Sequence, residues 1–100
     1  MKTIEVVKLL NINVQTIEVP AGSKILGLRE REDGVYLIYE GDPSKKSSPV
    51  TVLTFPTGGM ILSKLIKGAK YLGTVSGYDT GYEKIPELHI YYKQYKTKSA

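Results

Sequence analysis

The side chains best suited to bind another molecule alternate near the end of the chain, where residues 88–95 read LHIYYKQY. Successive side chains of an extended strand point to opposite faces. One face then carries His89, Tyr91, Lys93 and Tyr95. The opposite face carries Leu88, Ile90 and Tyr92, and we expect it to point into the protein. Exposed Tyr rings flanked by Lys can stack on bases beside neutralised phosphates, and they can equally anchor a protein interface.

Basic residues gather in the second half of the chain. Residues 1–50 hold seven Lys and Arg against seven Asp and Glu, and residues 51–100 hold seven Lys against three acids. The whole net charge of +4 therefore lies in the second half. Two stretches without an acid concentrate it, Lys64, Lys67 and Lys70 in one and Lys93, Lys96 and Lys98 in the other. Such asymmetry favours an acidic partner such as nucleic acid, although a solvated basic surface has the same composition.

Side chains for catalysis, metal binding and cofactor binding are sparse. The absence of Cys and the single His exclude thiol chemistry, cysteine metal sites and any site that needs two imidazoles. His89 has no neighbouring carboxylate to orient its ring, and the Glu30/Glu32 pair lies beside arginines where nothing desolvates it. Thr57-Gly58-Gly59 lacks the Lys-Ser/Thr ending of a phosphate-binding loop. The sequence therefore predicts a non-enzymatic protein with no catalytic residue, no metal and no cofactor.

Short β-like runs separated by turn clusters predict the fold that positions these residues. At 100 residues, with 41% hydrophobic residues, the chain fits a single β-rich domain over 1–100. The predicted strands are 3–10, 14–19, 24–32, 35–40, 50–55, 71–75 and 88–95. Such spacing is typical of an all-β or mainly β protein, a small antiparallel sandwich or barrel of six to seven short strands. Near 60–67 apolar residues and lysines fall on opposite sides of one short helix.

A hairpin is predicted between the third and fourth strands. Asp33-Gly34 is a strong signal for a type I′ turn, which needs positive φ at both central residues. A two-residue loop at that dipeptide pairs positions whose numbers sum to 67, for example Glu30 with Leu37. Charge then gathers at the tip and apolar side chains at the base. We expect a packed base and a tip that stands in water.

Residues 41–49 have the composition of a mobile surface loop. The segment GDPSKKSSP contains no large apolar side chain to anchor it and two Pro that oppose strand continuation. Residues 96–100 are expected to fray. No apolar run approaches the roughly 20 residues of a membrane-spanning helix, and Glu5 and Lys8 interrupt the start of the chain. These features predict a soluble protein without a membrane partner.

Several of these segments resemble a family of small uncharacterised proteins encoded by tailed bacteriophages. The shared features are TIEVPAGSKIL at 16–26, the hairpin after it, Thr57-Gly58, and YLGTV at 71–75. The resemblance extends over residues 14–95. Where related sequences carry Trp in the hairpin and the last strand, this chain has Tyr36, Tyr39, Tyr91 and Tyr92. The resemblance implies a compact β-rich fold and a viral origin, and it supplies no catalytic residues.

Together these features predict a phage accessory protein that binds a host or viral protein in the host cytoplasm, where it could inhibit a host function. Two alternatives stay open, a single-stranded nucleic-acid-binding β-barrel and a small virion or assembly protein. The sequence leaves the oligomeric state open, a homodimer included. The candidate binding residues are His89, Tyr91, Lys93, Tyr95, Lys64, Lys67 and Lys70.

Overall fold

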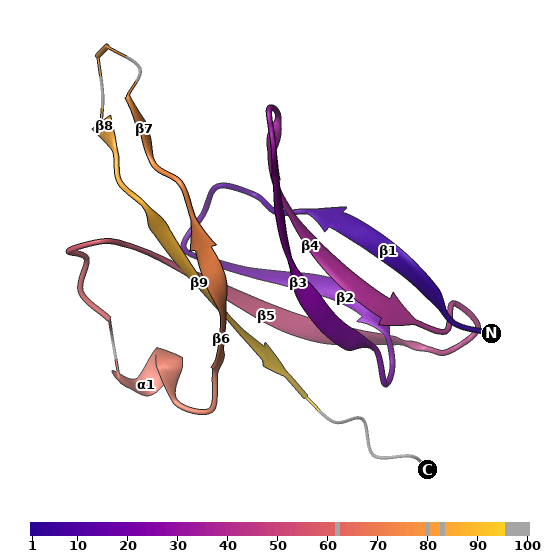
Figure 1. Ribbon diagram of the computed structural model, residues 1–100. Coiled ribbons are helices and arrows are strands. Elements are labelled where there is room, and N and C mark those ends of the chain that lie inside the picture. The colour runs from indigo at the N-terminus through magenta and orange to yellow at the C-terminus, as the bar shows by residue number, and fades with distance from the viewer. Residues whose placement is uncertain (62, 80, 83, 96–100) are drawn as a thin grey trace.

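Two antiparallel β-sheets pack against each other in the computed structural model (Figure 1). It describes residues 1–61, 63–79, 81–82 and 84–95. The three-stranded sheet has the order β1 (Thr3–Lys8), β4 (Gly34–Gly41), β3 (Lys24–Arg31). The four-stranded sheet has the order β2 (Val14–Pro20), β5 (Ser47–Pro56), β9 (Leu88–Gln94), β6 (Lys70–Val75). A two-stranded ribbon of β7 (Tyr78–Asp79) and β8 (Lys84–Ile85) projects beyond the sheets (Figure 1).

The mainly β, antiparallel fold with one short helix confirms the prediction, and it is a sandwich rather than a barrel. The two larger sheets share no strand among the described residues. The chain crosses from one sheet to the other between β1 and β2, between β2 and β3, and between β4 and β5. Its Cα atoms extend over 51 × 31 × 15 Å. The short dimension fits two sheets stacked about 10 Å apart.

The core fills the space between the two sheets. In β2 the inward side chains of Gln15, Ile17 and Val19 are buried and the residues between them are exposed, the alternation of a half-buried strand. Both sheets contribute to the core cluster, which consists of Leu9, Ile17, Val19, Ile25, Leu37, Val50, Val52, Val75 and Ile90. Removing one such side chain from water contributes about 1.5–3 kcal/mol. The core therefore supplies the main force that holds the sheets together.

The hairpin between β3 and β4 has a different turn from the predicted one. Arg31 pairs with Gly34, so Glu32 and Asp33 form the loop and paired positions sum to 65 rather than 67. The type I′ turn is wrong because Gly34 has a positive φ, 145°, while no described non-glycine residue does. A shift of two residues keeps each side chain on its predicted face. Leu37 accordingly faces the core.

Contacts of Asp33 stabilise a loop at residues 32–33, one residue earlier than the predicted loop at 33–34. The Tyr36 hydroxyl donates to Asp33 Oδ2 at 2.6 Å, and Lys8 Nζ of β1 lies 3.6 Å from the same oxygen. On the outer side the Arg31 guanidinium lies 4.7 Å from the centre of the Tyr36 ring. These contacts join the exposed tip to β1 and to its own strands.

The loop after β4 is shorter than the predicted segment 41–49. Gly41 ends β4 and Ser47 begins β5, which leaves residues 42–46 as the connection. Pro49 lies inside β5 opposite Glu18, one residue before the pairing of β5 with β9 begins at Val50. A missing N–H is tolerated at such a position, where the strand has a partner on one side only. The mobility of the connection stays a prediction, and the predicted frayed tail at 96–100 lies outside the described residues.

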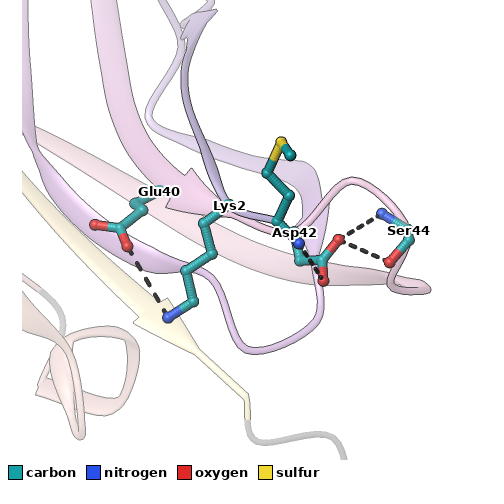
Figure 2. A network of polar contacts seen from close by, with 5 residues as sticks. Lys2, Glu40, Asp42 and Ser44 are labelled. Atoms are coloured by element: carbon teal, nitrogen blue, oxygen red, sulfur yellow. Dashed lines mark hydrogen bonds and ion pairs between the residues drawn. The ribbon is translucent and has the colours of Figure 1, made fainter.

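A polar network closes this connection (Figure 2). The backbone N–H and hydroxyl of Ser44 donate to Asp42 Oδ1 at 3.0 and 2.7 Å. These hydrogen bonds lower the pKa of the Asp42 carboxyl. The amino group of Met1 lies 3.7 Å from Asp42 Oδ2, and Lys2 Nζ lies 3.9 Å from Glu40 Oε1. The start of β1 is thus joined to the end of its neighbour β4.

The helix α1 (Ser63–Ile66) is shorter than the predicted 60–67. The backbone N–H of Lys67 donates to the Ser63 carbonyl at 3.1 Å, which closes its one turn. Gly68 follows with a φ of 79°, the left-handed conformation that ends many helices. Within the described ranges no helix is long and apolar enough to cross a membrane.

Replacing Gly34 should destabilise the protein. Gly34→Val places a β-branched residue at φ 145°, and its Cβ would lie 3.1 Å from Lys8 Cε. We expect the free energy of unfolding to fall by about 1–3 kcal/mol, measured from denaturant midpoints. Gly27→Val is the matched control, because a Cβ at Gly27 meets no atom within 4 Å and its φ is not positive. Equal midpoints for the two variants would contradict the backbone strain assigned to Gly34.

Acid should weaken the hairpin tip through Asp33. The hydrogen bond from Tyr36, followed by the charge of Lys8, holds the pKa of Asp33 below its ordinary value. A carboxyl with a depressed folded-state pKa stabilises the protein above its unfolded-state pKa, and this contribution disappears as the pH falls through the folded-state pKa. Tyr36→Phe should raise the Asp33 pKa in a carbon-13 carboxyl titration. Asp42 is the internal control, and an Asp33 titration that Tyr36→Phe leaves unchanged would contradict the assigned cause.

Candidate binding surface

A row of apolar side chains crosses all four strands on the outer face of the four-stranded sheet. Val14 of β2 pairs with Leu53 of β5, which pairs in turn with Tyr91 of β9. Tyr91 pairs on its other side with Tyr71 of β6. Both ends of the row are open to solvent, with Val14 47% and Tyr71 55% exposed, whereas Leu53 in the middle is 1% exposed. This row, together with Phe55, His89 and Lys93, is named the outer aromatic face.

Ring contacts fix the aromatic side chains of this face. The Tyr91 ring meets Phe55 edge-on at a centroid distance of 6.0 Å and Tyr71 at 5.2 Å. Edge-to-face pairs of this kind contribute about 0.5–1.5 kcal/mol each beyond the area they bury. Phe55 is 7% exposed and lies on the outer face, because it pairs with His89, which is two residues from Tyr91 and on the same face of β9. The rings are therefore held in place by contacts within the protein.

His89 joins β5 to β6 through hydroxyl groups. Its Nε2 lies 2.7 Å from Thr57 Oγ1 and its Nδ1 lies 2.9 Å from Thr74 Oγ1. Thr74 Oγ1 is also hydrogen-bonded to the Tyr71 hydroxyl. A neutral imidazole donates from one nitrogen and accepts at the other, and a hydroxyl can serve either role. The arrangement orients the ring without a carboxylate, so it lacks the third group of a nucleophilic triad.

The predicted alternation of β9 is confirmed. Ile90 belongs to the core, and Leu88 and Tyr92 pack against it. The side chains of His89, Tyr91 and Lys93 lie on the outer face, each half-buried. Lys93 stands one row from Tyr91 and pairs with Thr51 of β5.

Tyr95 does not join these residues, because β9 ends at Gln94 and the alternation ends with it. Tyr95 instead lines a hollow of about 420 Å³ with Lys70 and Tyr92. Gly22, Ser23, Gly68 and Gln94 complete its walls. Lys64 and Lys67 are exposed in and directly after α1 and do not line this hollow. The predicted binding residues therefore lie in three places. His89, Tyr91 and Lys93 are on the outer face, Lys70 and Tyr95 line the hollow, and Lys64 and Lys67 are exposed at α1.

Sequence reasoning missed the apolar partners of Tyr91. The sequence predicted the strands that contain Val14, Leu53, Phe55 and Tyr71. It did not predict these four side chains as binding residues. The sequence of β5 contains a pattern that indicates these partners. Val52 and Leu53 are adjacent apolar residues, so they point to opposite faces, and Phe55 is a second apolar residue on the face of Leu53. A strand that is apolar on both faces is covered on both faces or lies at the centre of a sheet.

No group of three or more His, Cys, Asp or Glu side chains in the described part of the chain is arranged to hold a metal ion. The surface consists of aliphatic side chains, rings, hydroxyls and one ammonium group. These groups can make apolar contacts and hydrogen bonds.

Removing the shared hydroxyl of Thr74 should loosen the network. Thr74→Val keeps the β-branched shape and removes the partner of both His89 Nδ1 and the Tyr71 hydroxyl. We expect the free energy of unfolding to fall by about 0.5–1.5 kcal/mol, the usual net value of a hydrogen bond. Thr16→Val, at an exposed position of β2, is the matched control and should change the free energy of unfolding little. Equal effects of the two substitutions would show that the His89 network adds nothing to stability.

Comparison with known proteins leaves the family open. No family model, no curated protein and no solved structure matches the chain. The resemblance to small proteins of tailed bacteriophages therefore stays a prediction, and function has to be inferred from the chemistry of the surface.

Proposed function

We propose that this protein is a non-enzymatic phage accessory protein that binds a host or viral protein in the host cytoplasm. The observation that supports this proposal is the apolar row of the outer aromatic face, which crosses four strands and is exposed at both ends. Aromatic residues are enriched in the buried centres of protein interfaces, and charged residues are depleted there. The phage origin and the cellular location rest on the resemblance of the sequence.

The charge of this face favours a protein over a nucleic acid. Lys93 is the one cation among the residues that define the face, and Glu18 of β2 lies on the same side of the sheet. Nucleic-acid binding depends on several cations that neutralise phosphates. A nearly neutral row of rings and aliphatic side chains instead matches an apolar protein surface with a polar rim.

A second candidate function has its own observation. The hollow that Tyr95 lines combines Lys70 with the rings of Tyr92 and Tyr95. A base of a single-stranded nucleic acid could stack on these rings, with its phosphate beside the Lys70 ammonium group. Such binding would weaken steeply as the salt concentration rises, since each neutralised phosphate releases counterions. A virion or assembly protein would use the outer aromatic face against a viral subunit, and the identity of the captured protein separates that case from a host target.

The outer aromatic face can be tested by capture. Tagged protein is incubated with lysates of phage-infected and uninfected bacteria, with and without nuclease, and bound proteins are identified by mass spectrometry. We expect nuclease-resistant capture of a defined protein. The double variant Val14→Ser/Tyr71→Ala should weaken that binding at least tenfold, because it removes both exposed ends of the apolar row and an aromatic anchor such as Tyr71 can contribute about 2 kcal/mol or more.

Ile4→Ser is the matched control, since Ile4 is an exposed apolar side chain on the other sheet, at 67% exposure. Near-UV circular dichroism checks that each variant is folded. A folded double variant that captures its partner as well as the wild type would refute the outer aromatic face as the site. Recovery that nuclease abolishes would favour the nucleic-acid function instead.

A further inference from the structure

We propose that the sandwich binds a small amphipathic amine at one open end, with the apolar part of the ligand between the sheets and its ammonium group at the mouth. The site lies between the two sheets beside the β3–β4 turn, so it is separate from the outer aromatic face. Its hollow has a volume of about 630 Å³. Sites for small molecules usually measure about 300–1,000 Å³.

The floor of the hollow is apolar and continuous with the core. Its apolar lining includes Leu9, Val35, Val75, Leu88 and Ile90. Leu9, Val75 and Ile90 are themselves members of the core cluster, and Val35 and Leu88 pack against it. An alkyl group placed here would extend the core and be stabilised by the removal of its methylene groups from water.

The mouth carries charge of both signs, but its cations already have partners. Lys8 lies 3.6 Å from Asp33, and Arg31 lies over the Tyr36 ring on the outer side. Asp33 is shared between Lys8 and the Tyr36 hydroxyl. The carboxylates of Glu30 and Glu32 also line the mouth, and no ion pair to either is present among the described residues. Three carboxylates, those of Glu30, Glu32 and Asp33, thus face the two cations, and the net charge of the mouth is negative.

Glu30 is placed to meet a ligand at the boundary between floor and mouth. It lies on the same face of β3 as Leu28, which packs against the core. Its Oε1 accepts a hydrogen bond from the Ser76 N–H at 2.6 Å, across the gap from β3 to the residue after β6. This bond fixes the carboxylate above the apolar floor. A cationic head joined to an apolar chain satisfies both parts of the hollow, and an anionic head would be repelled.

The test compares three probes that differ only in the head group. Decylamine, decanol and decanoate are titrated into the full-length protein below their micelle concentrations, and binding is followed by proton–nitrogen NMR spectra. Decylamine should bind most tightly and decanoate most weakly, with the largest amide shifts at Val35, Val75 and Ile90. Added salt should weaken the binding of decylamine and leave that of decanol nearly unchanged.

Glu30→Gln separates charge from structure, because the amide oxygen can still accept from the Ser76 N–H. We expect this variant to lower the affinity for decylamine about two- to fivefold, the range of an exposed ion pair, and to leave decanol binding unchanged. Glu18→Gln, on the outer face of β2, is the matched control and should change neither. Decanoate binding as tight as that of decylamine, or no effect of Glu30→Gln, would overturn the proposed charge selection. Absence of binding by all three probes, or shifts confined to the outer aromatic face, would overturn the site.

Discussion

Burial of β5 on both of its faces is the constraint on which the rest of the structure depends. Its inner side chains Val50 and Val52 are fully buried in the sandwich core, while Leu53 and Phe55 are buried on the opposite face. A strand of this kind has to lie at the centre of a sheet, because an edge or a solvated face would leave large apolar groups in water. The positions of β2 and β9 on either side of β5 follow from that requirement.

The same constraint creates the candidate binding surface. Leu53 needs apolar neighbours on the outer face, and the register supplies Val14 on one side and Tyr91 on the other. Tyr71 extends the row to the edge strand β6. Hydrogen bonds from His89 to Thr57 and Thr74 then orient the imidazole ring at the end of this face. The apolar outer row therefore stabilises the sheet, and it is open to solvent at its two ends, Val14 and Tyr71.

The two ends of the sandwich differ because different side chains meet there. At the end near the β2–β3 turn, the Gln94 amide donates to the Ser23 carbonyl and joins β9 to the turn that leads into β3. Gly41 allows the close approach of Ser23, whose hydroxyl a Cβ at that position would strike. At the other end Glu30 joins the sheets through Ser76, and a hollow with an apolar floor stays open beside this hydrogen bond. The proposed protein-binding face and the proposed small-molecule site thus lie in separate regions of the sandwich.

The sequence by itself determined the strands of the two larger sheets, the faces of β9 and the positive φ of Gly34, because two-residue periodicity and the lack of a Cβ in glycine are local properties. It did not predict the short strands β7 and β8. The tertiary structure decided the features that depend on partners. Contacts of Asp33 with Tyr36 and Lys8 stabilise the hairpin loop at residues 32–33. Pro49 pairs on one side only, so β5 can begin at Ser47, before the predicted start at residue 50. The strand order brought Val14 and Tyr71 into one row with Tyr91. The local sequence of a strand does not specify which distant strand pairs with it. The row that crosses the outer aromatic face could therefore be identified only from the tertiary structure.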